Sequence, residues 1–141
     1  MLEKILIFGI CALVLVSAQH AFAVDGTQRA ELKNARLVNA FGETSPQNIN
    51  ANQQIQVSAD IVNRQDTNQN YVYIVQITDQ NNVPVKLTWI SASFKAQQVF
   101  SPALSWSTDR PGTYTAQIFL WDSIKDAQAL AASTEITIIV S

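Results

Sequence analysis

Residues 106–121 read Trp-Ser-Thr-Asp-Arg-Pro-Gly-Thr-Tyr-Thr-Ala-Gln-Ile-Phe-Leu-Trp. Pro111 and Gly112 predict a turn, because proline presets one backbone angle and glycine accepts conformations closed to other residues. After this turn, apolar residues recur at every second position. A period of two predicts a β-strand over residues 113–121, with one face in the core and the other outside.

The rest of the chain repeats this pattern. Apolar residues alternate with polar ones, β-branched residues are frequent, and no stretch has a helical period. Turn-forming residues at 79–82 separate two of the apolar segments, and Pro102 interrupts another. Short strands at this spacing predict an all-β sandwich of about seven strands. The predicted strands cover residues 35–41, 54–63, 71–78, 85–92, 98–106, 113–121 and 134–140.

One tyrosine narrows the fold class further. In immunoglobulin-like sandwiches a tyrosine near the start of the sixth strand bonds back to the preceding loop, forming a tyrosine corner. Tyr114 has this place, after the Pro-Gly turn. Together with residues 57–63 (VSADIVN) and 71–78, the motif resembles the fibronectin-III/CARDB type of immunoglobulin-like extracellular domain of bacterial and archaeal surface proteins.

The resemblance covers residues 52–140 and implies a Greek-key sandwich with a role in adhesion or cell-surface contact. The sequence departs from antibody domains because it lacks their cysteine pair. Families of this kind usually occur as modules of larger proteins, and the architecture hosts many unrelated functions. The resemblance is therefore specific for the fold and says little about the function.

The N-terminal residues have the pattern of an export signal. A weakly positive start precedes an apolar run over residues 5–16, and an Ala-Phe-Ala pattern ends at Ala23. We predict a signal peptide over residues 1–23, an N-terminal arm over 24–34 and the sandwich over 35–141. The arm is either flexible or part of the first strand. This places the mature protein outside the cell or at its surface, with membrane contact only through the signal segment before cleavage; an uncleaved anchor remains an alternative.

Composition excludes several classes of function. Charged residues make up only 14% of the chain, and the net charge of −2 argues against binding to nucleic acid. The only Met, Cys and His are Met1, Cys11 and His20, all within the predicted signal peptide. The mature chain would then lack the usual ligands of zinc and copper and the groups for Ser-His or Cys-His catalysis. We expect no cofactor, no metal site and no enzymatic activity.

Alternation also predicts an apolar cluster on an outer face. If Tyr114 faces the core, then Phe119 and Trp121 face outward, and Val72 and Ile74 lie on the same face of the strand at 71–78. The two strands pair antiparallel in an immunoglobulin-like sheet, so these four side chains should meet. An exposed apolar patch usually marks a contact site, which makes this cluster the candidate binding surface.

A structural interpretation of the same cluster is somewhat favoured. The long connection at residues 122–132, with Ile124 and Leu130, could fold over the patch and bury it. Trp89 and Trp106 pose a similar choice, because aromatic faces can stack on sugar rings but large aromatics are usually buried. We expect both tryptophans to lie in the core.

Three hypotheses follow from these observations. The leading one is a non-catalytic exported sandwich that acts through protein–protein or cell-surface contacts, with an unidentified partner. A second is a subunit of an extracellular filament or coat, in which residues 24–34 add a strand to a neighbouring copy by self-association. A third is a soluble protein that binds a glycan or a small ligand on the surface formed by Val72, Ile74, Phe119 and Trp121.

Overall fold

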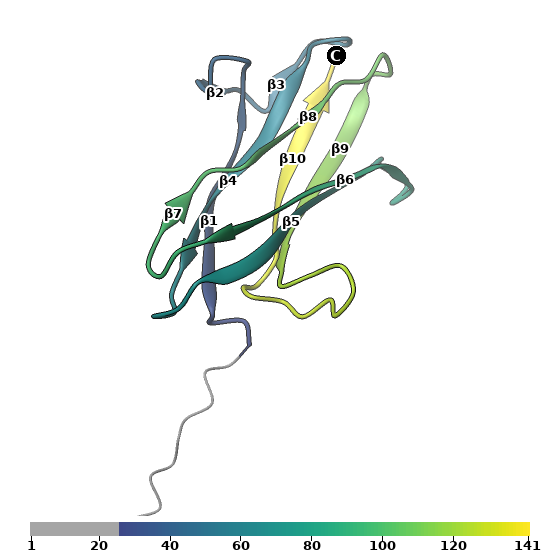
Figure 1. Ribbon diagram of the computed structural model, residues 1–141. Coiled ribbons are helices and arrows are strands. Elements are labelled where there is room, and N and C mark those ends of the chain that lie inside the picture. The colour runs from purple at the N-terminus through teal and green to yellow at the C-terminus, as the bar shows by residue number, and fades with distance from the viewer. Residues whose placement is uncertain (1–25) are drawn as a thin grey trace, which may run out of the picture.

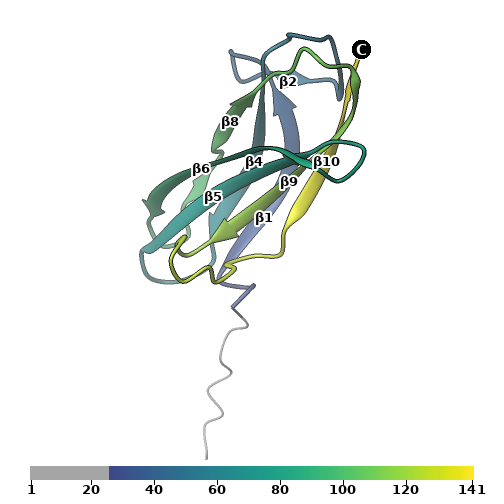
Figure 2. The same ribbon diagram turned by 90° about the vertical axis from the view of Figure 1, so that its right-hand side faces the viewer.

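The computed structural model describes residues 26–141, and all regular elements in this range are β-strands (Figure 1). The strands form two sheets that pack face to face, as Figures 1 and 2 show from two sides. This is the predicted all-β sandwich. The predicted signal peptide, residues 1–23, lies outside the described residues.

Five strands form the first sheet, and all of their pairings are antiparallel. They are β1 (Ala30–Val38), β2 (Thr44–Ser45), β4 (Ile55–Asn63), β7 (Val99–Phe100) and β8 (Ala103–Trp106). The order is β2-β1-β4-β7, and β8 also pairs with β4. The break between β7 and β8 falls at Pro102, as predicted, because proline cannot donate a hydrogen bond to a neighbouring strand.

Five more strands form the second sheet, in the order β3-β10-β9-β5-β6. They are β3 (Asn48–Ile49), β5 (Gln69–Thr78), β6 (Pro84–Phe94), β9 (Gly112–Trp121) and β10 (Thr134–Val140). Only β3 runs parallel to its neighbour β10. Strand β6 is the last in this order, so one of its edges is unpaired within the domain.

The core lies between the sheets, where alternate residues of both meet. On β9 the buried positions are Tyr114, Ala116, Ile118 and Leu120, in agreement with the predicted alternation. The hydroxyl of Tyr114 donates a hydrogen bond to the carbonyl oxygen of Arg110 at 2.8 Å, which is the contact expected of a tyrosine corner.

The first strand differs from the prediction. It begins at Ala30 and ends at Val38, whereas we expected residues 35–41. Residues 30–33, assigned above to the arm, pair with β4, and the amide of Ala30 donates to the carbonyl oxygen of Leu130 at 2.9 Å. The irregularity between Lys33 and Arg36 interrupts the period of two along this strand. Strands β2 and β3 were not predicted, since each has only two residues.

Candidate functional site

The outer face of the second sheet carries a largely apolar hollow of about 380 Å³, which we call the aromatic hollow. It lies over β5, β6 and β9 and is bordered by the connection that follows β9. Seven residues line it: Ile74, Gln76, Leu87, Trp89, Phe119, Trp121 and Ile124.

Strand register explains why these side chains meet. Ile74 on β5 lies opposite Phe119 on β9 and opposite Trp89 on β6, so the three form one row across the sheet. In the adjacent row, Val72 lies opposite Trp121. Directly opposed residues share a face of the sheet, which brings large apolar side chains from three strands together.

The structure thus joins the four residues proposed from sequence, but their exposure differs from the prediction. Val72 and Ile74 are buried, at 3% and 4% exposure, while Phe119 and Trp121 are half-buried. The rings of Phe119 and Trp121 lie in contact, with centroids 5.8 Å apart. The expectation of an open patch was therefore wrong for the two β5 residues. Ile74 forms the buried floor of the hollow, whereas Val72 is not among the residues that line it.

Trp89 was assigned to the core, and this was also wrong. It lies on the outer face of β6 and is 52% exposed. The register of β5 with β6 shifts by one residue between Ile77 and Thr78, and this bulge decides the face on which Trp89 lies. Trp106 is buried as expected, and its ring packs edge-on against Tyr114 with centroids 5.0 Å apart.

The connection after β9 contributes one wall of the hollow instead of a cover. The Asp122 carboxylate accepts hydrogen bonds from the amides of Ser123 (2.6 Å) and Gln128 (3.0 Å), which fold this segment back on itself. Ile124, at the rim, remains 49% exposed. Leu130 is fully buried in the core cluster, so it closes one end of the sandwich and does not cover the patch.

Sequence reasoning missed Leu87 as a wall of the hollow, although Val85, Leu87 and Trp89 alternate along β6. That alternation was the available signal for a shared face. Assigning the face required the register of the hairpin, and the bulge changes that register.

The side chains of the hollow are suited to non-covalent contact. None of its seven lining residues is titratable, and Gln76 supplies the polar side chain at its border. Aromatic faces and aliphatic groups offer contact area, and an amide offers one donor and one acceptor. Acid–base or nucleophilic catalysis has no suitable side chain among these residues.

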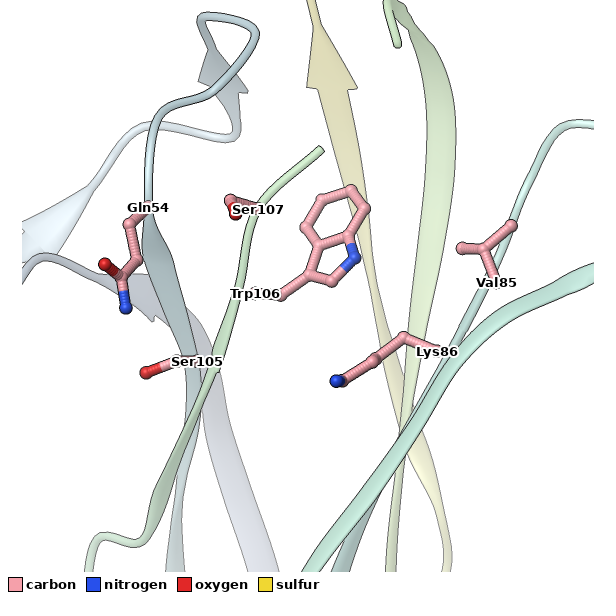
Figure 3. Close-up of a pocket in the computed structure, with 6 residues that line it drawn as sticks. All are labelled: Gln54, Val85, Lys86, Ser105, Trp106 and Ser107. Atoms are coloured by element: carbon pink, nitrogen blue, oxygen red, sulfur yellow. The ribbon is translucent and has the colours of Figure 1, made fainter. Parts of the chain in front are cut away.

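A second hollow, of about 270 Å³, lies where the edges of the two sheets approach each other (Figure 3). Its lining residues are Gln54, Val85, Lys86, Ser105, Trp106 and Ser107. Figure 3 shows the indole of Trp106 and the side chain of Lys86 reaching into the space between β8 and β6. Lys86 is the only charged residue among them, so the hollow lacks a paired charge for chemistry.

One charged group outside these hollows is held by several hydrogen bonds. The Asp60 carboxylate on β4 accepts hydrogen bonds from Ser101 (2.6 Å), Asn34 (2.8 Å) and Arg36 (2.9 Å). These contacts hold its pKa at about 2, with the Ser101 hydroxyl as the largest cause, followed by the Asn34 amide; the Arg36 guanidinium also lowers it, while burial raises it.

The described residues contain no group of three His, Cys, Asp or Glu side chains arranged to hold a metal ion. Within residues 26–141 there is also no helix with the length and apolarity needed to cross a membrane.

Comparison with known proteins gives structural relatives only. No protein-family model matches the chain, and no curated protein matches it. Among solved structures, the C-terminal domain of Wzt superposes with a TM-score of 0.68 at 15% identity, covering 83% of this chain and 76% of that one. A CARDB domain of a Pyrococcus furiosus protein, in complex with di-metal ions, gives 0.55 at 13% identity, covering 80% and 94%.

A β-glucosidase from Listeria innocua, in complex with gluconolactone, also matches, with a TM-score of 0.58 at 15% identity. The match covers 79% of this chain but only 16% of the enzyme, so it concerns a small part of that protein. These identities carry information on the fold alone. The chain shares the immunoglobulin-like β-sandwich fold of the CARDB domain and the Wzt C-terminal domain.

Proposed function

We propose that this protein is a non-catalytic binding domain that acts outside the cell or at its surface and contacts its partner through the aromatic hollow. The observation that carries the proposal is the half-exposed Trp89, which lines one hollow together with Phe119 and Trp121, with the buried Ile74 between Trp89 and Phe119. An immunoglobulin-like sandwich fits a binding role, and an apolar hollow lined by tryptophan supports one at this face.

We favour a protein partner. Six of the seven side chains that line the hollow are aliphatic or aromatic, one is an uncharged amide, and none is charged. A protruding apolar side chain of a partner would fill such a hollow and release water from both surfaces. Export of the chain, the second part of the proposal, rests on the signal-like pattern of residues 1–23.

A glycan is the second candidate, and the two tryptophans favour it. Aromatic faces stack on the C–H faces of sugars, and the Gln76 amide could bond to hydroxyl groups. The filament hypothesis, in the form that uses residues 24–34, loses support because residues 30–33 pair with β4 of their own sheet.

The test is binding of the fluorescently labelled protein to envelopes of the producing cells, in competition with unlabelled protein. We expect Trp89→Ala to reduce binding about tenfold or more, as loss of a central interface aromatic does. Phe41→Ala is the control, since Phe41 is 88% exposed in the turn after β1, away from the hollow.

Treatment of the envelopes separates the two candidates. Protease should abolish binding if the partner is a protein, and periodate oxidation should abolish it if the partner is a glycan. Equal binding by Trp89→Ala and the wild type would overturn the hollow as the contact site.

A further inference from the structure

Strand β6 is an open sheet edge with apolar side chains on both faces. It is eleven residues long and stands last in the order of its sheet, so no strand of the domain is hydrogen-bonded to its outer edge. Leu87, Trp89 and Ile90 are all exposed by 44% or more. Backbone groups at alternate positions of an edge strand point away from the sheet and can pair with another strand.

The usual protections of an edge are confined to one end of β6. Pro84 and the bulge lie next to the turn, whereas residues 86–94 pair with β5 in an uninterrupted register. Lys86 is the only charged residue in the strand. From Leu87 to Ser93 this edge therefore has neither proline, bulge nor charge to prevent pairing. At its end, the carbonyl oxygen of Phe94 accepts a hydrogen bond from the side-chain amide of Asn63 at 3.4 Å.

We propose that two copies of this chain associate by antiparallel pairing of their β6 edges, with the two-fold axis at Ile90. The sequence of β6 is complementary to itself in this register. Trp89 of one copy lies opposite Ser91 of the other, and Leu87 lies opposite Ser93, so each large side chain meets a small one.

Charge is compatible with the same register. Lys86 lies opposite Phe94 of the second copy, and the two Lys86 residues are separated by eight positions along the strands, about 26 Å. Two like charges at that distance are largely screened at physiological ionic strength. Only Ile90 meets its own counterpart, and an isoleucine pair adds apolar contact.

Pairing in this way joins the two second sheets into one and leaves both aromatic hollows on the same outer face. The inference stands on the free edge and does not depend on the proposed function. A second copy is the occupant because it presents the same open edge, in the complementary register, without having to unfold.

Size-exclusion chromatography with light scattering, on the protein purified after export, tests the pairing across a dilution series. We expect a dimer, and we expect Ile90→Lys to raise its dissociation constant about tenfold or more by placing two ammonium groups opposite each other. Ile139→Lys is the matched control, because Ile139 lies on β10 with 45% exposure, against 44% for Ile90.

Cross-linking tests the register. Residues opposed across an antiparallel pair have Cα atoms about 4.5–5.5 Å apart, within the range of a disulfide. With Cys11→Ala, which removes the chain's only cysteine, Ile90→Cys should form a covalent dimer under mild oxidation and Ile139→Cys should not.

Three results would overturn the proposal: a wild type that is monomeric throughout, a dimer that Ile90→Lys leaves intact, or a polymer, since isologous pairing of one edge closes at two copies. Circular dichroism of each variant establishes that it is folded. A protein that dimerises but does not bind envelopes would contradict the proposed function and leave the dimer proposal standing. The failure of one proposal can therefore be told from the failure of the other.

Discussion

At the scale of single residues, two tyrosine hydroxyls make directional hydrogen bonds that hold a turn and the two sheets in place. Tyr114 bonds to the carbonyl oxygen of Arg110 and so sets the turn before β9. Tyr73, fully buried on β5, donates to the carbonyl oxygen of Val57 on β4 at 3.1 Å and thereby links the two sheets. Burial raises the pKa of Tyr73, so this hydroxyl remains a donor throughout the ordinary pH range.

Replacing either tyrosine by phenylalanine keeps the ring and removes the bond. We expect Tyr114→Phe to lower the free energy of unfolding by about 1 kcal/mol, the usual net value of such a hydrogen bond. Tyr73→Phe should cost at least as much, because its bond lies where water cannot replace the hydroxyl. Urea unfolding followed by tryptophan fluorescence measures both, and unchanged midpoints would contradict the assignment.

At the scale of elements, the β5–β6 hairpin shows where sequence reasoning succeeded and where it failed. The turn at 79–82 was predicted, and the Asp79 carboxylate does accept hydrogen bonds from the amides of Asn81 and Val83. An uninterrupted register from this turn would set Trp89 opposite Tyr73, whose side chain lies in the core. The bulge shifts the register by one residue and puts Trp89 opposite Ile74, on the outer face.

A bulge leaves little trace in a single sequence, because any residue can occupy it. Fold class, the turns and the faces of β9 were predictable, since alternation on a half-buried strand reports its faces directly. The burial of Val72 and Ile74 was not predictable, because it comes from side chains on other strands.

The connection from β9 to β10 divides into a buried and an exposed part. Leu130 is fully buried, and its amide donates to the carbonyl oxygen of Leu120 at 2.8 Å. Ile124 stands at the rim of the aromatic hollow.

Truncating the two side chains should separate folding from binding. Leu130→Ala should lower the free energy of unfolding by about 2–5 kcal/mol, because it removes core contacts and leaves a cavity. Ile124→Ala should change stability by about 0.5 kcal/mol or less and weaken envelope binding. Urea unfolding and the envelope assay measure the two effects. If Ile124→Ala proves as destabilising as Leu130→Ala, the connection acts as a cover and the hollow is not an open site.

At the scale of the whole molecule, few charged side chains link distant segments. Within residues 26–141, the carboxylate of Asp60 accepts the most hydrogen bonds from other side chains. This network joins β1, β4 and the segment between β7 and β8 on one face of the first sheet. The network also spans the irregularity in β1 between Lys33 and Arg36, where Asn34 has a positive φ of 53°. Stability in acid should therefore report on this network.

The sign of the pH dependence follows from the pKa of Asp60, which is about 2 in the folded protein against 3.8 for a free aspartate. The stabilisation is present above about pH 4 and is lost as the pH falls towards 2, because the protonated group no longer accepts its bonds as an anion. Asp60→Asn should lower the free energy of unfolding at neutral pH by at most about 2 kcal/mol, and its difference from the wild type should shrink through that window. Asp126→Asn, which removes an exposed carboxylate, controls for net charge. Urea unfolding at a series of pH values measures the difference, and a constant difference down to about pH 2 would show that the network does not set the acid stability of the fold.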